Sequence, residues 1–116
     1  MSYDIEVGVK VSGTTQIIPC VDLRIPNPSY NYGEMFKRSM GWKFKQGIWY
    51  SMWDAMRNIE IGIQNLSAFD YSEYSTSEYP RGQQKRALYI LKALKQDVDW
   101  FCEENNISYK YLWIRW

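Results

Sequence analysis

Apolar and polar side chains alternate along the first part of the chain. Over residues 3–11 apolar residues alternate with charged or small ones, which is the period-2 pattern of a half-buried strand. A turn at residues 12–15 separates this run from a second extended run over residues 17–25. Pro19 lacks an amide donor, so the second strand is expected at a sheet edge or a bulge. The two runs predict an antiparallel hairpin, which prolines turn out of the sheet at residues 26–28.

A short helix is predicted over residues 32–40. Ser29 or Asn31 is expected to cap its first turn with a side-chain oxygen, and Gly41 is expected to end it. From Gly41 to Tyr50 large rings and lysines follow one another between two glycines. This segment is therefore expected to form a loop or an irregular hairpin.

Two longer helices are predicted from their repeating apolar positions. Ser51 is expected to cap the first, since Asp54 three residues later completes a capping-box pattern. The second is predicted over residues 81–104, after an acidic, tyrosine-rich loop at residues 67–80. The apolar stripes consist of Met52, Met56, Ile59, Ile63 and Leu66, and of Ala87, Leu91, Leu94, Val98 and Phe101. Two matched stripes joined by a loop predict an antiparallel helix pair.

The final segment, residues 107–116, is rich in aromatic and β-branched residues and predicts a third strand. Its two faces would carry Tyr109, Tyr111 and Trp113 on one side, and Leu112, Ile114 and Trp116 on the other. One face is expected to meet the helices, and the other to stay exposed or meet a partner. The order β-β-α-α-α-β predicts an α+β fold, a small antiparallel sheet with helices packed on one face, in a single domain over residues 1–116.

Composition excludes several classes of function. The chain has no histidine and two cysteines, which argues against serine–histidine catalysis, most zinc sites and a disulfide scaffold. The carboxylate pairs lack the neighbouring basic or metal-ligating residues that catalysis needs. Neither enzyme activity nor a cofactor nor a bound metal is therefore expected. No apolar run approaches the length of a membrane span, roughly 18 residues, and the first residues do not resemble a signal peptide. A cytoplasmic protein with no membrane partner is expected.

Aromatic residues are unusually frequent, at 17% of the chain. Six Trp, ten Tyr and four Phe are more rings than a core of this size can enclose, so several are expected at the surface. Because the extra rings of the last strand leave an apolar face or edge on a small sheet, a homo-oligomer is expected.

Two clusters combine rings or free helix amides with basic side chains. The first consists of Trp42, Lys43, Lys45, Trp49, Tyr50, Trp53 and Arg57, and the second of Arg81, Lys85 and Arg86. Rings can stack on a base while Lys and Arg bind phosphates, so the first cluster is a candidate nucleotide site. The open alternatives are that its rings belong to the core and that the second cluster is a solvated helix face. The acidic loop at residues 67–80 could dock on a basic partner or could cover the helix pair.

From Tyr30-Asn31 onward the chain resembles a group of small uncharacterised proteins of phages and prophages. The resemblance rests on Tyr30-Asn31, Met35-Phe36, Gly41, Gly62-Ile63-Gln64-Asn65-Leu66 and Gly82, and covers about residues 29–101. It implies a phage origin and action in the cytoplasm of a bacterial host.

The function expected from these observations is that of a non-catalytic, phage-encoded binding protein acting against host defence. The first hypothesis is that it sequesters a small nucleotide-type signal in an aromatic and basic pocket. The alternative is direct inhibition of a host defence protein through exposed rings and the acidic tyrosine loop. A third class, nucleic-acid binding, requires a continuous basic face that depends on the fold.

Overall fold

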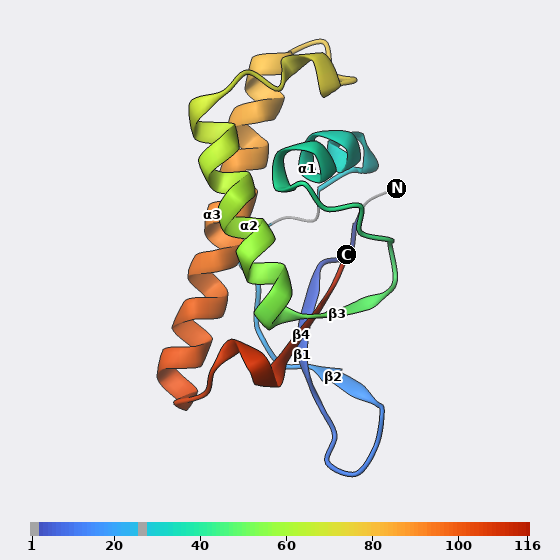
Figure 1. Ribbon diagram of the computed structural model, residues 1–116, viewed down its shortest axis with the longest axis vertical. Helices are drawn as coiled ribbons and strands as arrows, with labels where there is room; N and C mark the ends of the chain where they lie inside the picture. The colour runs from blue at the N-terminus through green and yellow to red at the C-terminus, as the bar shows by residue number, and fades with distance from the viewer. Residues whose placement is uncertain (1–2, 26–27) are drawn as a thin grey trace.

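The computed structural model describes residues 3–25 and 28–116; the turn predicted at residues 26–28 therefore lies partly outside the described residues. The strands are β1 (Glu6–Lys10), β2 (Ile17–Pro19), β3 (Trp49–Ser51) and β4 (Leu112–Arg115), and the α-helices are α1 (Gly33–Met40), α2 (Met52–Ala68) and α3 (Pro80–Asn105). Three single turns of 3₁₀-helix, η1 (Tyr30–Tyr32), η2 (Ser72–Tyr74) and η3 (Tyr109–Tyr111), complete the elements. Figure 1 shows α2 and α3 side by side, with the sheet beside them.

The four strands form one antiparallel sheet in the order β2-β1-β4-β3. The predicted hairpin of β1 and β2 is confirmed, and Pro19 lies on an edge strand as expected. β3 was not predicted as a strand of the sheet, because Trp49 and Tyr50 were expected in a loop or an irregular hairpin and Ser51 was expected to cap the next helix. This three-residue segment becomes a strand by pairing with β4, so its structure depends on a partner far along the chain.

The three helices lie where the apolar periodicity predicts them. The stripes of α2 and α3 are buried or half-buried, which confirms the helix pair, and Gly41 ends α1 with a left-handed φ of 62°. The expected caps are wrong in detail. Tyr32 occupies the N-cap of α1 in place of Ser29 or Asn31, and Ser51 precedes α2 without a capping hydrogen bond from its side chain. In both cases another element precedes the helix without a loop between them: η1 runs directly into α1, and β3 runs directly into α2.

The core lies between the helices and one face of the sheet. Leu112, Ile114 and Trp116 are buried against the helices, so theirs is the face of the last strand that meets the helices, a choice that the sequence prediction left open. Trp116 stacks on Phe44 with ring centroids 4.6 Å apart, and Phe36 lies at 5.8 Å. The fold is therefore an α+β arrangement with its aromatic core under one sheet face.

A bulge brings β2 unusually close to β1 at Gly8. The amides of Cys20 and Val21 both donate to the Val7 carbonyl, at 2.9 and 3.2 Å. A Cβ atom at Gly8 would lie 2.4 Å from the Ile18 carbonyl oxygen, which is backbone and cannot rotate away. Only glycine fits at this position without moving the edge strand.

Gly8→Ala is accordingly expected to lower the free energy of unfolding by about 1–3 kcal/mol, measured by urea denaturation. Gly82→Ala is the matched control, since the nearest atom to a Cβ there is 3.7 Å away and the residue lies in the first turn of α3. That substitution should change stability by less than about 1 kcal/mol, in the stabilising direction. Equal effects at the two glycines would contradict the close approach of β2.

Candidate functional site

Two rings of the predicted aromatic and basic loop pack against the core. The Trp42 ring packs edge-to-face with the rings of Phe44, Tyr50 and Trp116, at centroid distances of 5.4, 5.0 and 5.9 Å. The hydroxyl of Tyr50 accepts a hydrogen bond of 2.8 Å from the Lys45 amide. The structure thus brings Trp42 and Tyr50 together as part of the packing that holds the loop to the sheet.

The other members of that predicted cluster are separated. Lys43 and Lys45 have exposed side chains on the loop, and Trp53 and Arg57 are exposed one turn apart on α2. Trp49 belongs to β3, where the Arg115 guanidinium lies 4.7 Å above its ring. The linings of the five hollows that stand out on the described surface include no residue from 42 to 57.

The second predicted cluster lies on α3 and is partly brought together. Arg81 and Lys85 line a hollow of about 680 Å³ between the end of α2 and the first half of α3. Arg86 is turned elsewhere, with its guanidinium 5.2 Å above the Tyr89 ring. The full lining of the hollow consists of Leu66, Ser67, Ala68, Phe69, Asp70, Arg81, Gln84, Lys85, Leu88 and Lys92. We call this the α2–α3 hollow.

Among the described residues, three cations of the α2–α3 hollow form no close ion pair. Arg81, Lys85 and Lys92 recur at helical spacing along α3, so their side chains share one side of the helix. Among the described residues, none of the three lies within 4.0 Å of a carboxylate oxygen. Like charges gathered without a partner repel one another, and an anion placed between them would relieve that repulsion.

One acid lies in the same hollow. Hydrogen bonds from Ser72, together with the nearby Arg81 charge, hold the pKa of Asp70 below its usual range. Asp70 is therefore ionised at neutral pH and offsets part of the positive charge. Three cations and one anion leave the hollow with an excess of positive charge.

Gln84 fixes the walls of the α2–α3 hollow. Its Nε2 donates to the carbonyl oxygens of Leu66 and Phe69, at 3.0 and 2.6 Å. Its Oε1 accepts a hydrogen bond of 2.8 Å from the Tyr71 amide. These bonds hold the end of α2 against α3 and place Phe69, whose side chain is 64% exposed, in the lining.

The sequence prediction missed Lys92, Phe69 and Gln84 as members of this site. A helical projection of α3 would have found Lys92, which follows Lys85 by two turns on the same side. Phe69 and Gln84 carry no comparable signal, because their positions depend on how α2 ends against α3.

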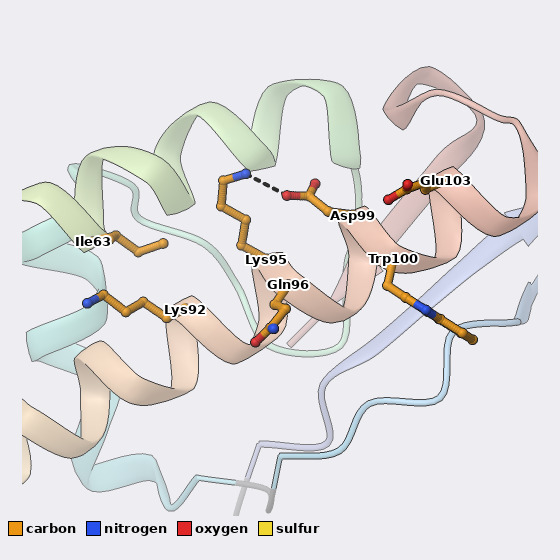
Figure 2. Close-up of a pocket in the computed structure, with 7 residues that line it drawn as sticks. All are labelled: Ile63, Lys92, Lys95, Gln96, Asp99, Trp100 and Glu103. Carbon is orange, nitrogen blue, oxygen red and sulfur yellow. Dashed lines mark hydrogen bonds and ion pairs between the residues drawn. The ribbon is translucent and has the colours of Figure 1, made fainter.

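A second polar cluster joins α2, α3 and η3 near another hollow of about 450 Å³. Figure 2 shows the Lys95 side chain reaching toward Asp99, and their Nζ–Oδ2 distance is 2.7 Å. Glu60 of α2 lies 3.7 Å from the same ammonium, and the Tyr109 hydroxyl donates a hydrogen bond to Asp99. The sequence prediction did not identify this network.

Protonation in this network is stable at neutral pH. The hydrogen bond to Asp99 raises the pKa of Lys95, and burial together with the bond to Asp99 raises the pKa of the Tyr109 phenol. Both pKa values start above 9, so both groups keep their protons until the solution is strongly alkaline. Lys95 is shared by the carboxylates of Asp99 and Glu60, and through Tyr109 of η3 the network connects the segment before the last strand to the helix pair.

Comparison of the chain with protein-family profiles, with curated protein sequences and with solved structures finds no match. Among the described helices, none combines the length and the apolarity needed to cross a membrane.

Proposed function

We propose that this protein binds a nucleotide-type ligand in the α2–α3 hollow. The observation that carries the proposal is the presence of three unpaired cations and an exposed ring, Phe69, in the lining of one hollow. A volume of about 680 Å³ is in the range of small-molecule sites. In the cytoplasm of an infected bacterium, such binding would sequester a nucleotide signal and so act against host defence.

Each group in the hollow has a role in this proposal. Arg81 and Lys85 bind the phosphates, since charge-assisted hydrogen bonds to phosphate are the strong class. Phe69 stacks on the base, and Asp70 accepts hydrogen bonds from a ribose hydroxyl. Gln84 has no contact with the ligand in this proposal. It holds the end of α2 against α3 through its hydrogen bonds to the carbonyl oxygens of Leu66 and Phe69.

The test is calorimetry with a panel of linear and cyclic nucleotides, using inorganic phosphate as the comparison. Lys85→Ala is expected to weaken binding about tenfold or more, because one charge-assisted contact contributes about 1.5–3 kcal/mol. Phe69→Ala should weaken the binding of nucleotides but leave the binding of inorganic phosphate unchanged.

Lys43→Ala is the matched control, since it removes an equally exposed lysine that lines none of the hollows found. It should bind nucleotides with wild-type affinity. Absence of heat with every nucleotide, or an equal loss with Lys43→Ala, would refute the α2–α3 hollow as the site.

Direct protein binding is the second candidate function. Phe69 and Tyr79 are the most exposed large rings among the described residues, at 64% and 75%, and they flank the acidic loop. Rings beside carboxylates suit docking on a basic surface of a host defence protein. A purified defence protein whose capture is weakened by Glu73→Ala, while nucleotides give no heat, would favour this function over the first.

A further inference from the structure

The outer face of the sheet carries rings and cations that neither proposed function uses. Because Leu112 and Ile114 of β4 are buried against the helices, Trp113 and Arg115 point to the opposite side. The register places Gly8 of β1 opposite Trp113, and both Glu6 and Trp49 opposite Arg115. Trp49, Trp113, Lys10, Arg115 and Glu6 therefore share one face, which we call the outer sheet face.

Each tryptophan of the outer sheet face has a cation above it. The Lys10 ammonium lies 4.1 Å from the centre of the Trp113 ring, and the Arg115 guanidinium lies 4.7 Å from that of Trp49. Both rings are half-buried, so the strands support them from below while one side stays accessible. The chemistry is that of flat aromatic surfaces with mobile positive charges beside them.

Among the described residues, two lysines near the outer sheet face, Lys10 and Lys110, form no ion pair within 4.0 Å. Glu6 is already paired with Arg115, at 2.6 Å. Lys10 has an exposed side chain, and Lys110 lies in η3, directly before β4, with its ammonium 5.2 Å from the exposed Tyr111 ring. A negatively charged partner is therefore favoured over a second copy of this chain, which would bring the same positive patch against itself.

We propose that the outer sheet face binds single-stranded nucleic acid. Bases stack on Trp113 and Trp49 and displace the cations from the rings, and Lys10, which has no ion-pair partner among the described residues, then moves to a phosphate. Trp49 lies on β3 opposite Arg115, two residues along from Trp113 on the neighbouring strand β4. The two backbone positions are therefore further apart than the roughly 6.6–6.8 Å between alternate residues of one strand, and well beyond the spacing of about 3.4 Å between stacked bases of a duplex strand. The face therefore selects an extended, unstacked strand and rejects a duplex.

This inference does not depend on the α2–α3 hollow. The two sites share no residue, and their ligands differ in length. A substitution in one site should leave the other intact, so each can fail independently.

The experiment measures binding of fluorescently labelled 12-nucleotide oligo(dT) and oligo(U) by anisotropy, with a duplex of equal length as the comparison. Wild-type protein is expected to bind the single strands and to bind the duplex at least about tenfold more weakly. Trp113→Ala should weaken single-strand binding about fivefold to 150-fold, as loss of one stacked base predicts. Trp100→Ala is the matched control, because it removes a 57% exposed tryptophan that belongs to α3 and not to the outer sheet face, and this variant should bind like the wild type.

Two further variants guard against misfolding of Trp113→Ala. Trp113→Tyr keeps a ring and should retain most of the affinity. Lys10→Ala removes an exposed charge without touching the core, and should reduce the slope of log K against log salt by about 0.7.

Three results would overturn the proposal. The first is no single-strand binding by the wild type at low salt. The second is an equal loss with Trp100→Ala, or duplex binding as tight as that of the single strand. The third is loss of strand binding in Lys85→Ala but not in Lys10→Ala, which would assign the strand to the α2–α3 hollow.

Discussion

Trp116→Ala is expected to lower the free energy of unfolding by about 3–5 kcal/mol, the range for truncation of a buried tryptophan. Trp116 is 1% exposed and lies at the centre of the aromatic core, stacked on Phe44 and in contact with Phe36 and Trp42. These partners come from α1 and from the loop after it, whereas Trp116 directly follows β4. Its loss would leave a cavity where the sheet, α1 and this loop meet.

Trp116→Phe separates ring packing from the polar part of the indole. Trp116 Nε1 is buried and has no hydrogen-bond partner among the described residues. Phenylalanine removes this unpaired donor, whose burial costs about 1–3 kcal/mol, and this gain offsets part of the lost volume. The expected net loss is below about 2 kcal/mol by urea denaturation. If alanine and phenylalanine cost the same, the stacked ring is not what stabilises this junction.

Ile59→Ala is expected to lower the free energy of unfolding by about 2–5 kcal/mol. Ile59 is fully buried in the stripe of α2, where it packs with the buried leucines of α3. Leu91→Ala and Leu94→Ala, on the facing stripe, should cost similar amounts, since both side chains are also fully buried.

Ile61→Ala gives a matched control for this prediction. It is the same substitution two residues further along the same helix, but the Ile61 side chain is 39% exposed. The expected loss of unfolding free energy is below about 1 kcal/mol, because truncating a partly exposed side chain removes little buried apolar area and leaves no cavity. Chemical denaturation that gave equal losses at the two isoleucines would mean that the helix pair is misassigned.

The predicted parts of the fold are those with a local signal. The stripes of α2 and α3 repeat at helical spacing over many residues, and β1 alternates at period 2, so each pattern shows its own buried face. β3 has three residues and no measurable period, and its partner strand β4 comes from the far end of the chain. The N-cap of α1 at Tyr32 was missed for a related reason, since η1 precedes this helix and displaces the expected caps.

The candidate sites depended on the fold to a greater extent. The sequence predicted that Arg81 and Lys85 are neighbours, because residues four apart lie about one turn apart on the same side of a helix. In the structure both residues line the α2–α3 hollow. Of the predicted loop cluster from Trp42 to Arg57, the structure keeps Trp42 and Tyr50 in contact and separates the other members. Strand pairing turns Trp49 to the outer sheet face, and packing turns Trp42 toward Trp116.

By itself, the sequence determined the helices, the β1–β2 hairpin and which residues of each element are apolar, because these follow from spacing along a chain of fixed geometry. Only the tertiary structure decided which cations remain without a partner and which rings remain accessible. Both properties depend on distances between residues far apart in the chain, such as Phe69 beside α3 and Lys10 above Trp113. Those distances are set by the packing of α2 on α3 and by the register of β1 on β4, which no local pattern encodes.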